Sequence, residues 1–235
     1  MKKLLVLLTC VALLALCAGP ALAEGEGTKL SVSGNGTVLV ESDLAIVTVG
    51  VREASADVLV AQAAVNEKIA AIKQALLDAG VQETEINTDS INIYANYDYS
   101  DNTEVIVGYT ANNSLSVRTT DIDNVGALID AAFAAGANTL DNVQFTVQDD
   151  SEAREQALTK AVEDARRKAD VLAAAAGMQV AAIESIAESG VYTYDSMRNF
   201  AQMDAAATEG SGAGTLVQAA LVSVDASVSM DFILQ

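Results

Sequence analysis

Acidic side chains are the reactive groups that this sequence brings closest together. Asp98, Asp101 and Glu104 place three carboxylates within seven residues. Carboxylate oxygens are the ligands that Ca²⁺ prefers in proteins. An EF-hand loop needs a glycine at its sixth position, and this stretch has none there, so its spacing does not match that motif. We therefore predict a solvated turn, with a carboxylate site for a divalent cation as the alternative.

The residues that catalysis uses most often are missing from most of the chain. The sequence contains no histidine, and both cysteines, Cys10 and Cys17, lie within its first 23 residues. Beyond them, cysteine nucleophiles, histidine bases and Ser-His-Asp triads are excluded. Asp149, Asp150 and Glu152 lie at the expected start of a helix, where the helix dipole accounts for them. We expect a protein that is not an enzyme and holds no cofactor, with a carboxylate-based enzyme as the alternative.

The first 23 residues have the features of a secretory signal peptide. Two lysines at 2–3 precede an uncharged apolar run over 4–18, and 21–23 form a small-x-small cleavage site. The run is shorter than the ~20 residues that a membrane-spanning helix needs. We expect cleavage after Ala23, export to the periplasm or out of the cell, and no transmembrane span in the mature chain. An uncleaved anchor or a lipid on Cys17 is the alternative.

The predicted mature chain is strongly acidic. Without the two N-terminal lysines it holds 11 basic and 32 acidic residues, a net charge of −21. Such a surface repels phosphate groups and anionic lipids. We therefore expect no nucleic-acid partner.

Hydrophobic periodicity predicts a chain with both strands and helices. Alternation with a two-residue period predicts strands over 30–40, 43–53, 86–97, 103–119, 139–147, 179–194 and 216–232. Helical spacing of apolar residues predicts helices over about 55–79, 122–135 and 151–177. Polar outer faces favour an α+β domain over 24–235, with antiparallel sheets and two long helices and one short helix packed on one side. Each long helix precedes a strand pair, which suggests an internal duplication.

Small and polar residues predict how these elements begin, end and connect. Gly34-Asn35-Gly36 predicts a bulge or tight bend in the first strand. Glu41-Ser42 is the expected tight connection between the first two strands, and Ser55 is the expected cap of the first helix. Residues 195–214 lack periodicity and predict a mobile loop.

Residues 108–117, with the sequence GYTANNSLSV, predict a strand that carries one asparagine toward the core. Asn113 falls on the mostly apolar face of this strand, between Ala111 and Leu115. A buried asparagine without hydrogen-bond partners costs roughly 1–3 kcal/mol. We expect Asn113 to be a structural polar residue that bonds a neighbouring backbone group, with a ligand-binding role as the alternative.

Four tyrosines gather around the polar turn expected at 98–102. They are Tyr94, Tyr97, Tyr99 and Tyr109. Tyrosine is enriched at protein interfaces, so these side chains are candidates for an interaction surface. Packing between neighbouring strands is the alternative.

The order of elements and four segments resemble the SIMPL-domain family. The segments are VSGNGTV at 32–38, GYTANNSLSV at 108–117, EDARRKADVLAAAAGM at 163–178 and GAGTLVQAALVSVDASVSMDFIL at 212–234. The chain departs from the family at two turns, where Ser42 and Ala213 stand in place of frequent prolines. The family includes periplasmic proteins described as oxidative stress defence and immunogenic proteins, and it has no agreed catalytic motif.

This resemblance implies a periplasmic α+β protein with a role in cell-envelope or oxidative stress protection. Long strands whose edges need cover favour self-association, so we expect a homo-oligomer, or a contact with an envelope protein. Two further hypotheses remain open. One is a module that binds a protein or glycan through the tyrosine-rich hairpin and the 195–214 loop, and the other is the carboxylate-based cation binder or enzyme.

Overall fold

The computed structural model describes residues 27–100, 104–195 and 214–235. The predicted signal peptide, Asp101 and nearly all of the loop predicted at 195–214 lie outside the described residues. Within the described part of the chain, no helix is long and apolar enough to cross a membrane.

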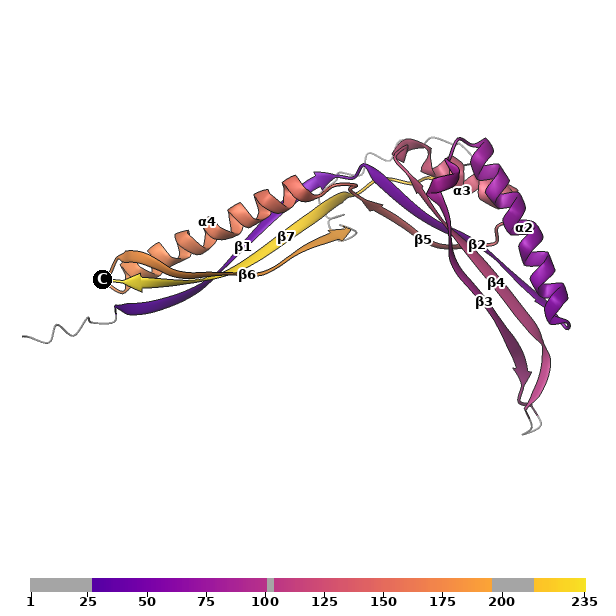
Figure 1. The fold of residues 1–235 in the computed structure, drawn as a ribbon, viewed down its shortest axis with the longest axis horizontal. Coiled ribbons are helices and arrows are strands. Elements are labelled where there is room, and N and C mark those ends of the chain that lie inside the picture. Colours follow the sequence, from indigo (N-terminus) through magenta and orange to yellow (C-terminus); the bar gives the residue numbers. More distant parts are fainter. Residues whose placement is uncertain (1–26, 101–103, 196–213) are drawn as a thin grey trace, which may run out of the picture.

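The described residues form two antiparallel sheets and three α-helices (Figure 1), which confirms the predicted α+β class. The first sheet has the order β1-β7-β6 and the second has the order β3-β4-β2-β5. The strands are β1 (Thr28–Glu41), β2 (Leu44–Ser55), β3 (Ile86–Asp98), β4 (Val105–Thr119), β5 (Thr139–Thr146), β6 (Val180–Asp195) and β7 (Leu221–Leu234). The helices are α2 (Val58–Asp78), α3 (Val125–Ala134) and α4 (Ser151–Ala175).

The two sheets repeat one topology. In the first sheet, β1 leads to α4 and then to the hairpin of β6 and β7, and β7 pairs with β1. In the second sheet, β2 leads to α2 and then to the hairpin of β3 and β4, and β4 pairs with β2. The second unit is inserted between β1 and α4 of the first. This agreement in topology matches the duplication that the sequence suggested.

The connection predicted between β1 and β2 does not make a hairpin. Glu41 ends β1 in the first sheet, and Leu44 begins β2 in the second, so the chain changes sheets at this point. β1 instead pairs with β7 over its whole length, from Thr28 opposite Leu234 to Glu41 opposite Leu221. A short connection therefore joins two units here, because each strand finds its partner in its own unit.

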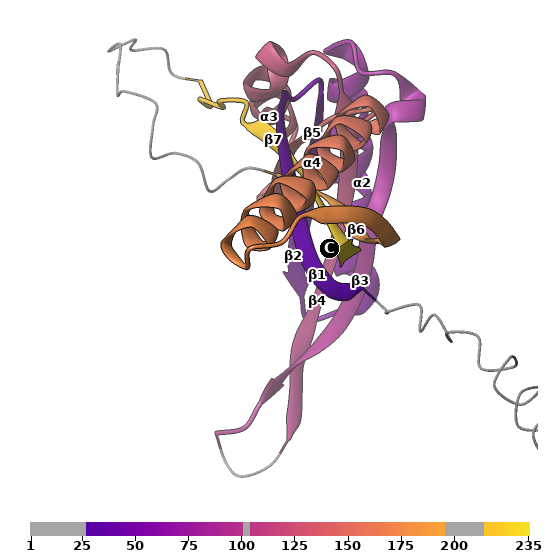
Figure 2. The same ribbon diagram turned by 90° about the vertical axis from the view of Figure 1, so that its left-hand side faces the viewer.

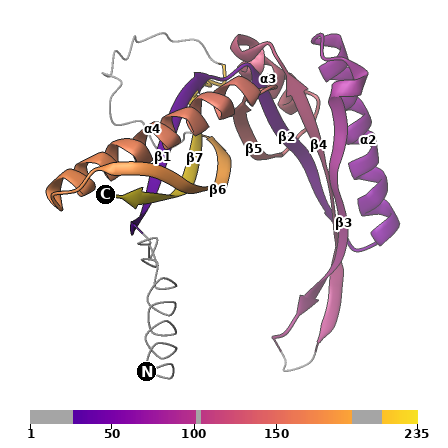
Figure 3. The same ribbon diagram turned by 60° about the vertical axis from the view of Figure 1, so that its left-hand side comes forward.

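The glycines of β1 make room for a helix rather than a bulge. The pairing of β1 with β7 runs without a register shift through Gly34 and Gly36, so the predicted bulge is wrong. A Cβ at Gly34 would lie 2.0 Å from the carbonyl oxygen of Ala161, and one at Gly36 would lie 2.1 Å from that of Ala157. α4 turns a row of buried alanines toward this strand: Ala153, Ala157, Ala161, Ala165, Ala169 and Ala173. Small residues on both sides thus bring helix and strand into backbone contact (Figure 3).

Side chains of α4 also cover the free edge of β1. Lys168 Nζ donates to the carbonyl of Ser33 at 3.0 Å, and Lys160 Nζ donates to the carbonyl of Thr37 at 3.1 Å. Between them, the Asn35 N–H donates to Asp164 Oδ2 at 3.1 Å. The three helix residues are four positions apart, and they contact every second residue of the strand. Because an open edge invites pairing with another chain, this row protects the edge.

Asp164 makes this edge cover dependent on pH. Its hydrogen bonds with Lys168, with the Asn35 backbone and with Arg167 lower its pKa to about 2. A carboxyl group whose pKa is lower in the folded state stabilises the fold above its unfolded pKa, and this stabilisation is lost as the pH falls toward 2. We expect the free energy of unfolding, measured with urea, to fall less between pH 5 and pH 2 in Asp164→Asn than in wild type. Glu163→Gln, on the exposed side of the same helix, is the matched control and should follow wild type.

The second sheet has its own core beneath α2 and α3. Alternate residues of β2 and β4 fill it, including Val47, Val49 and Val51, together with Ile72 and Leu76 from α2. The α2 helix is capped by Asp57, whose side chain accepts hydrogen bonds from the backbone N–H groups of residues 59 and 60. The cap predicted at Ser55 is therefore wrong by two residues. Both residue types can cap a helix, so sequence alone does not choose between them.

Candidate interaction surface

The β3–β4 hairpin extends well beyond the helix that covers its sheet (Figures 1 and 2). The last residue of β2, Ser55, pairs with Tyr109, and α2 begins three residues later. The part of the hairpin beyond Tyr109 therefore has neither β2 beside it nor α2 above it. Large exposed side chains are concentrated on this hairpin, and we call them the apolar hairpin surface: Ile91, Ile93, Tyr94, Tyr97, Tyr99, Val105, Ile106 and Val107.

The two isoleucines are exposed because α2 does not reach the edge strand. Ile91 lies opposite Asn113 and Ile93 lies opposite Ala111, so both isoleucines are on the helix side of the sheet. Their partners on β4 are buried beneath α2, but β3 lies at the outer edge. Ile91 is 63% exposed and Ile93 is 40% exposed. These two apolar side chains are therefore exposed to solvent, although a helix packed over β3 would bury them.

The predicted tyrosine cluster is divided by this geometry. Tyr94, Tyr97 and Tyr99 are exposed, and the rings of Tyr97 and Tyr99 lie 6.1 Å apart between centroids. Tyr109 is half-buried and pairs with Ala95 at the level where the sheet narrows to two strands. Three of the four tyrosines therefore belong to the exposed surface. Sequence alone does not single out the aliphatic residues beside them, because their exposure depends on which strands α2 covers.

The acidic turn is only partly described. Asp98 accepts a hydrogen bond from the backbone N–H of Ser100 at 2.9 Å, and its hydrogen bonds with Ser100 hold its pKa below the usual value. Glu104 is exposed, and Asp101 lies outside the described residues. In the described parts of the chain, no three acidic, histidine or cysteine side chains are arranged to hold a metal ion. The cation site at this turn therefore stays a prediction.

Asn113 lies on the helix side of β4, as its position in the sequence predicts. It is 8% exposed, between Val51 of β2 and Ile91 of β3. Among the described residues, its side-chain oxygen has no hydrogen-bond partner, so the backbone partner that we expected for it is not found there. A buried acceptor without a partner costs roughly 1–3 kcal/mol.

This orphaned acceptor predicts a stabilising substitution. Asn113→Val removes the polar group and matches the valine beside it, so we expect the free energy of unfolding to rise by about 1 kcal/mol. Urea denaturation of both proteins measures the difference. Asn92→Val, on the exposed face of β3, is the control and should change stability by less than about 0.5 kcal/mol. A loss of stability in Asn113→Val would show that the asparagine has a partner after all.

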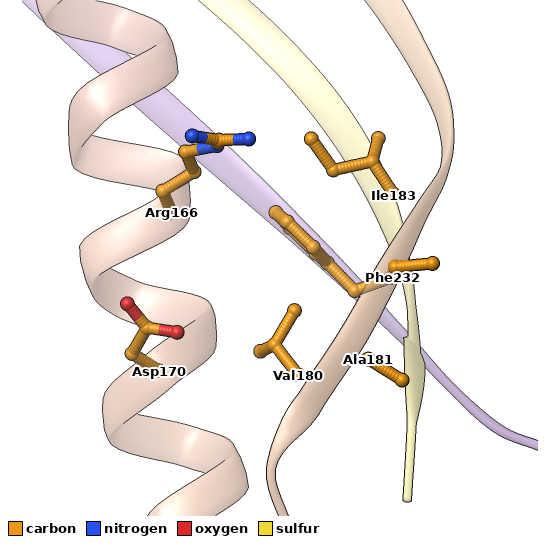
Figure 4. A pocket seen from close by; sticks show the side chains of 7 residues that line it. Arg166, Asp170, Val180, Ala181, Ile183 and Phe232 are labelled. Atoms are coloured by element: carbon orange, nitrogen blue, oxygen red, sulfur yellow. The ribbon is translucent and has the colours of Figure 1, made fainter.

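A cavity of about 370 Å³ lies between α4 and β6 (Figure 4). α4 packs over β1 and β7, which leaves the helix side of β6 partly open. Phe232 and Ile183 give the cavity an apolar floor, and Arg166 and Asp170 line it from the helix. No ion pair joins these two side chains in the described structure. Both units thus have an edge strand, β3 or β6, that its helix does not fully cover.

The fold and its surfaces define an α+β protein with two repeated units and a projecting apolar hairpin. Comparison with known families gives a match over residues 30–232 to SIMPL, described as a protein of unknown function (DUF541). The chain therefore belongs to the SIMPL family, as the resemblance of its motifs indicated.

Curated relatives agree with this assignment. The 26 kDa periplasmic immunogenic protein of Brucella melitensis is 29% identical over 168 residues, which are 69% of this chain and 67% of the relative. The uncharacterized protein YggE of Escherichia coli K12 is 25% identical over 148 residues, 63% of this chain and 60% of the relative. YggE of Edwardsiella ictaluri is 25% identical over 162 residues, 68% of each chain.

Proposed function

We propose that this protein is exported to the periplasm and acts there without catalysis, by assembling with further copies of itself through the apolar hairpin surface. The observation that carries this proposal is the group of eight exposed large side chains on one projecting hairpin. Exposed large apolar side chains that gather on one element are typical of protein interaction sites. The word periplasmic in the name of the Brucella melitensis relative, and the signal peptide predicted from the sequence, support the periplasm as the compartment.

The strand edges favour contact through side chains over simple strand pairing. The edge of β1 is covered by α4. The pairing of β3 with β4 has two register shifts, and that of β6 with β7 has three. Such irregularities blunt an edge against the addition of another strand. The hairpin side chains are then the surface best suited to hold a second copy, and an envelope protein is the other partner that they fit.

The carboxyl groups support a role without catalysis. A catalytic acid would show a raised pKa inside a cleft. Among the described residues, every carboxyl whose pKa departs clearly from its usual value has it lowered, and hydrogen bonds to the charged form are the main cause in each case. These groups are Glu83, Asp98, Asp130, Asp149, Asp150, Asp164 and Asp231. We propose that assembly serves cell-envelope or oxidative stress protection, the role that the family resemblance implies.

Cross-linking through single cysteines tests the contact between copies. The chain from Glu24 has no cysteine, so a cysteine in place of Ile93 is its only thiol. A bismaleimide should join two copies of Ile93→Cys at the concentration where the protein assembles. Leu172→Cys on α4, where the native side chain is 49% exposed against 40% for Ile93, is the matched control and should assemble without being cross-linked. Equal cross-linking of both variants would contradict a contact at the hairpin.

A further inference from the structure

In the described part of the chain, no helix covers one face of the first sheet, and most side chains on this face are polar. α4 packs on the other face, against the buried valines, methionine and phenylalanine of β7. The uncovered face carries alternate residues of β7: Ser223, Asp225, Ser227, Ser229 and Asp231. Their partners on β1 include Ser31, Ser33, Asn35 and Thr37. Hydroxyl and carboxyl groups therefore form rows across neighbouring strands.

Two carboxylates hold these hydroxyls in place. Asp231 accepts hydrogen bonds from Ser31 at 2.5 Å and from Ser185 at 2.6 Å. Asp225 accepts from Thr37 at 2.5 Å and from Ser223 at 3.1 Å. Each carboxylate oxygen has capacity for a further hydrogen bond. The face thus offers fixed acceptors and donors at regular spacing.

Two exposed tyrosines border this polar face along β6. Tyr192 lies opposite Asp225 and Tyr194 lies opposite Ser223, so both rings are on the uncovered face. Their centroids are 6.1 Å apart and their planes differ by 35°. Both side chains are more than half exposed.

Gly190 fixes the position of the first ring. A Cβ at this glycine would lie 2.7 to 2.9 Å from three atoms at the far end of the Tyr192 side chain. The tyrosine therefore folds back along the strand and rests against the glycine backbone. Gly190 also has φ of +140°, which other residues rarely adopt. Gly190 therefore leaves space along the strand for the ring of Tyr192, which a side chain at this position would take up.

We propose that this face binds an extended, neutral oligosaccharide. A sugar ring has a flat C–H surface, which fits the two tyrosine rings, and hydroxyls, which fit Asp225 and the serine and threonine rows. A protein partner would need an apolar centre. The residues opposite the tyrosines, Asp225 and Ser223, are small and polar, and the exposed side chain of Leu39 on β1 lies beyond them, opposite Ser223. The carboxylates and the net charge of −21 predicted for the mature chain disfavour anionic glycans.

Isothermal titration calorimetry with the chain from Glu24 tests this site. The probes are cellohexaose, chitohexaose and, as an anionic comparison, hexagalacturonic acid. We expect at least one neutral probe to bind and the anionic probe not to bind. Tyr192→Ala and Tyr194→Ala should each weaken binding about tenfold, which corresponds to 1.4 kcal/mol. Val171→Ala, which truncates an exposed side chain of α4 on the other side of the sheet, is the control and should bind as wild type does.

Two more variants test whether binding depends on the ring of Tyr192 and on its position. Tyr192→Phe retains the ring and should retain most of the affinity, whereas Gly190→Ala should displace the ring and weaken binding. Circular dichroism confirms that each variant is folded. Absence of binding by both neutral probes, preference for the anionic probe, or full affinity in folded Tyr192→Ala would overturn the proposal. None of these results bears on assembly through the hairpin, because the site lies on the other sheet.

Discussion

Replacing Gly34 with valine is expected to lower the free energy of unfolding by 3 kcal/mol or more, the upper range for overpacked cores. The added Cβ would lie 2.0 Å from the carbonyl oxygen of Ala161 and 2.7 Å from the Cβ of Ala165. No side-chain rotation relieves a clash with a helix backbone, so α4 must move away from β1. That movement would also break the hydrogen bonds that Lys160, Asp164 and Lys168 make with the strand edge.

Urea unfolding followed by circular dichroism measures this loss. Ser33→Val is the matched control, because it adds a valine at the next position of the same strand, on the exposed face. We expect the control to stay within about 0.5 kcal/mol of wild type. Wild-type stability in Gly34→Val would contradict the backbone contact between α4 and β1.

The second large effect is expected at the hairpin. Ile91→Asn combined with Ile93→Asn should convert the assembled protein to a monomer, because it removes the two aliphatic side chains from the apolar hairpin surface. The thermal midpoint of the variant at a concentration where wild type is dissociated should stay close to that of wild type, because both side chains are exposed. Size-exclusion chromatography with light scattering measures the mass.

A control with equal exposed area separates this effect from a general loss of apolar surface. Val171 and Leu172 on α4 are 62% and 49% exposed, against 63% and 40% for the two isoleucines. The double variant Val171→Asn and Leu172→Asn should keep the assembled mass. If the helix variant dissociates as the hairpin variant does, the contact is not specific to the hairpin.

The sequence predicted most elements because their periods are strong and unbroken. The alternation of β7 continues through Asp231 and Phe232, and its buried side is the side predicted. The first residues assigned to this strand, from 216, do not join it, and it begins at Leu221. The four-residue alanine repeat of α4 likewise predicted a helix with a narrow, small-residue face. Such patterns depend only on neighbouring residues in the sequence, so they predict an element whatever its tertiary contacts are.

Errors arose where the meaning of a residue depends on a distant partner. A glycine inside a strand indicates either a bulge or the close approach of another backbone. At Gly34 and Gly36 the reason is the close approach of another backbone. This is known only from the positions of Ala157 and Ala161, which lie more than a hundred residues away in the sequence. The short connection predicted at Glu41-Ser42 is present, but only the structure shows that it joins strands of different sheets.

The candidate surfaces were predicted only in part. The sequence places Tyr94, Tyr97 and Tyr99 near one turn, but it does not show that α2 leaves the neighbouring isoleucines of the edge strand β3 uncovered. Nor does it place Tyr192 and Tyr194 beside the serines of β1 and β7, because that neighbourhood depends on strand order. Surface function in this chain therefore follows from how the repeated units are assembled more than from any local motif.

The mass of the wild-type chain from Glu24, measured by light scattering over a range of concentrations, tests the central claim most directly. Assembly through the apolar hairpin surface predicts a defined multiple of the single-chain mass, equal in Ca²⁺ and in a chelator. A single-chain mass at every concentration would contradict assembly with further copies of this protein.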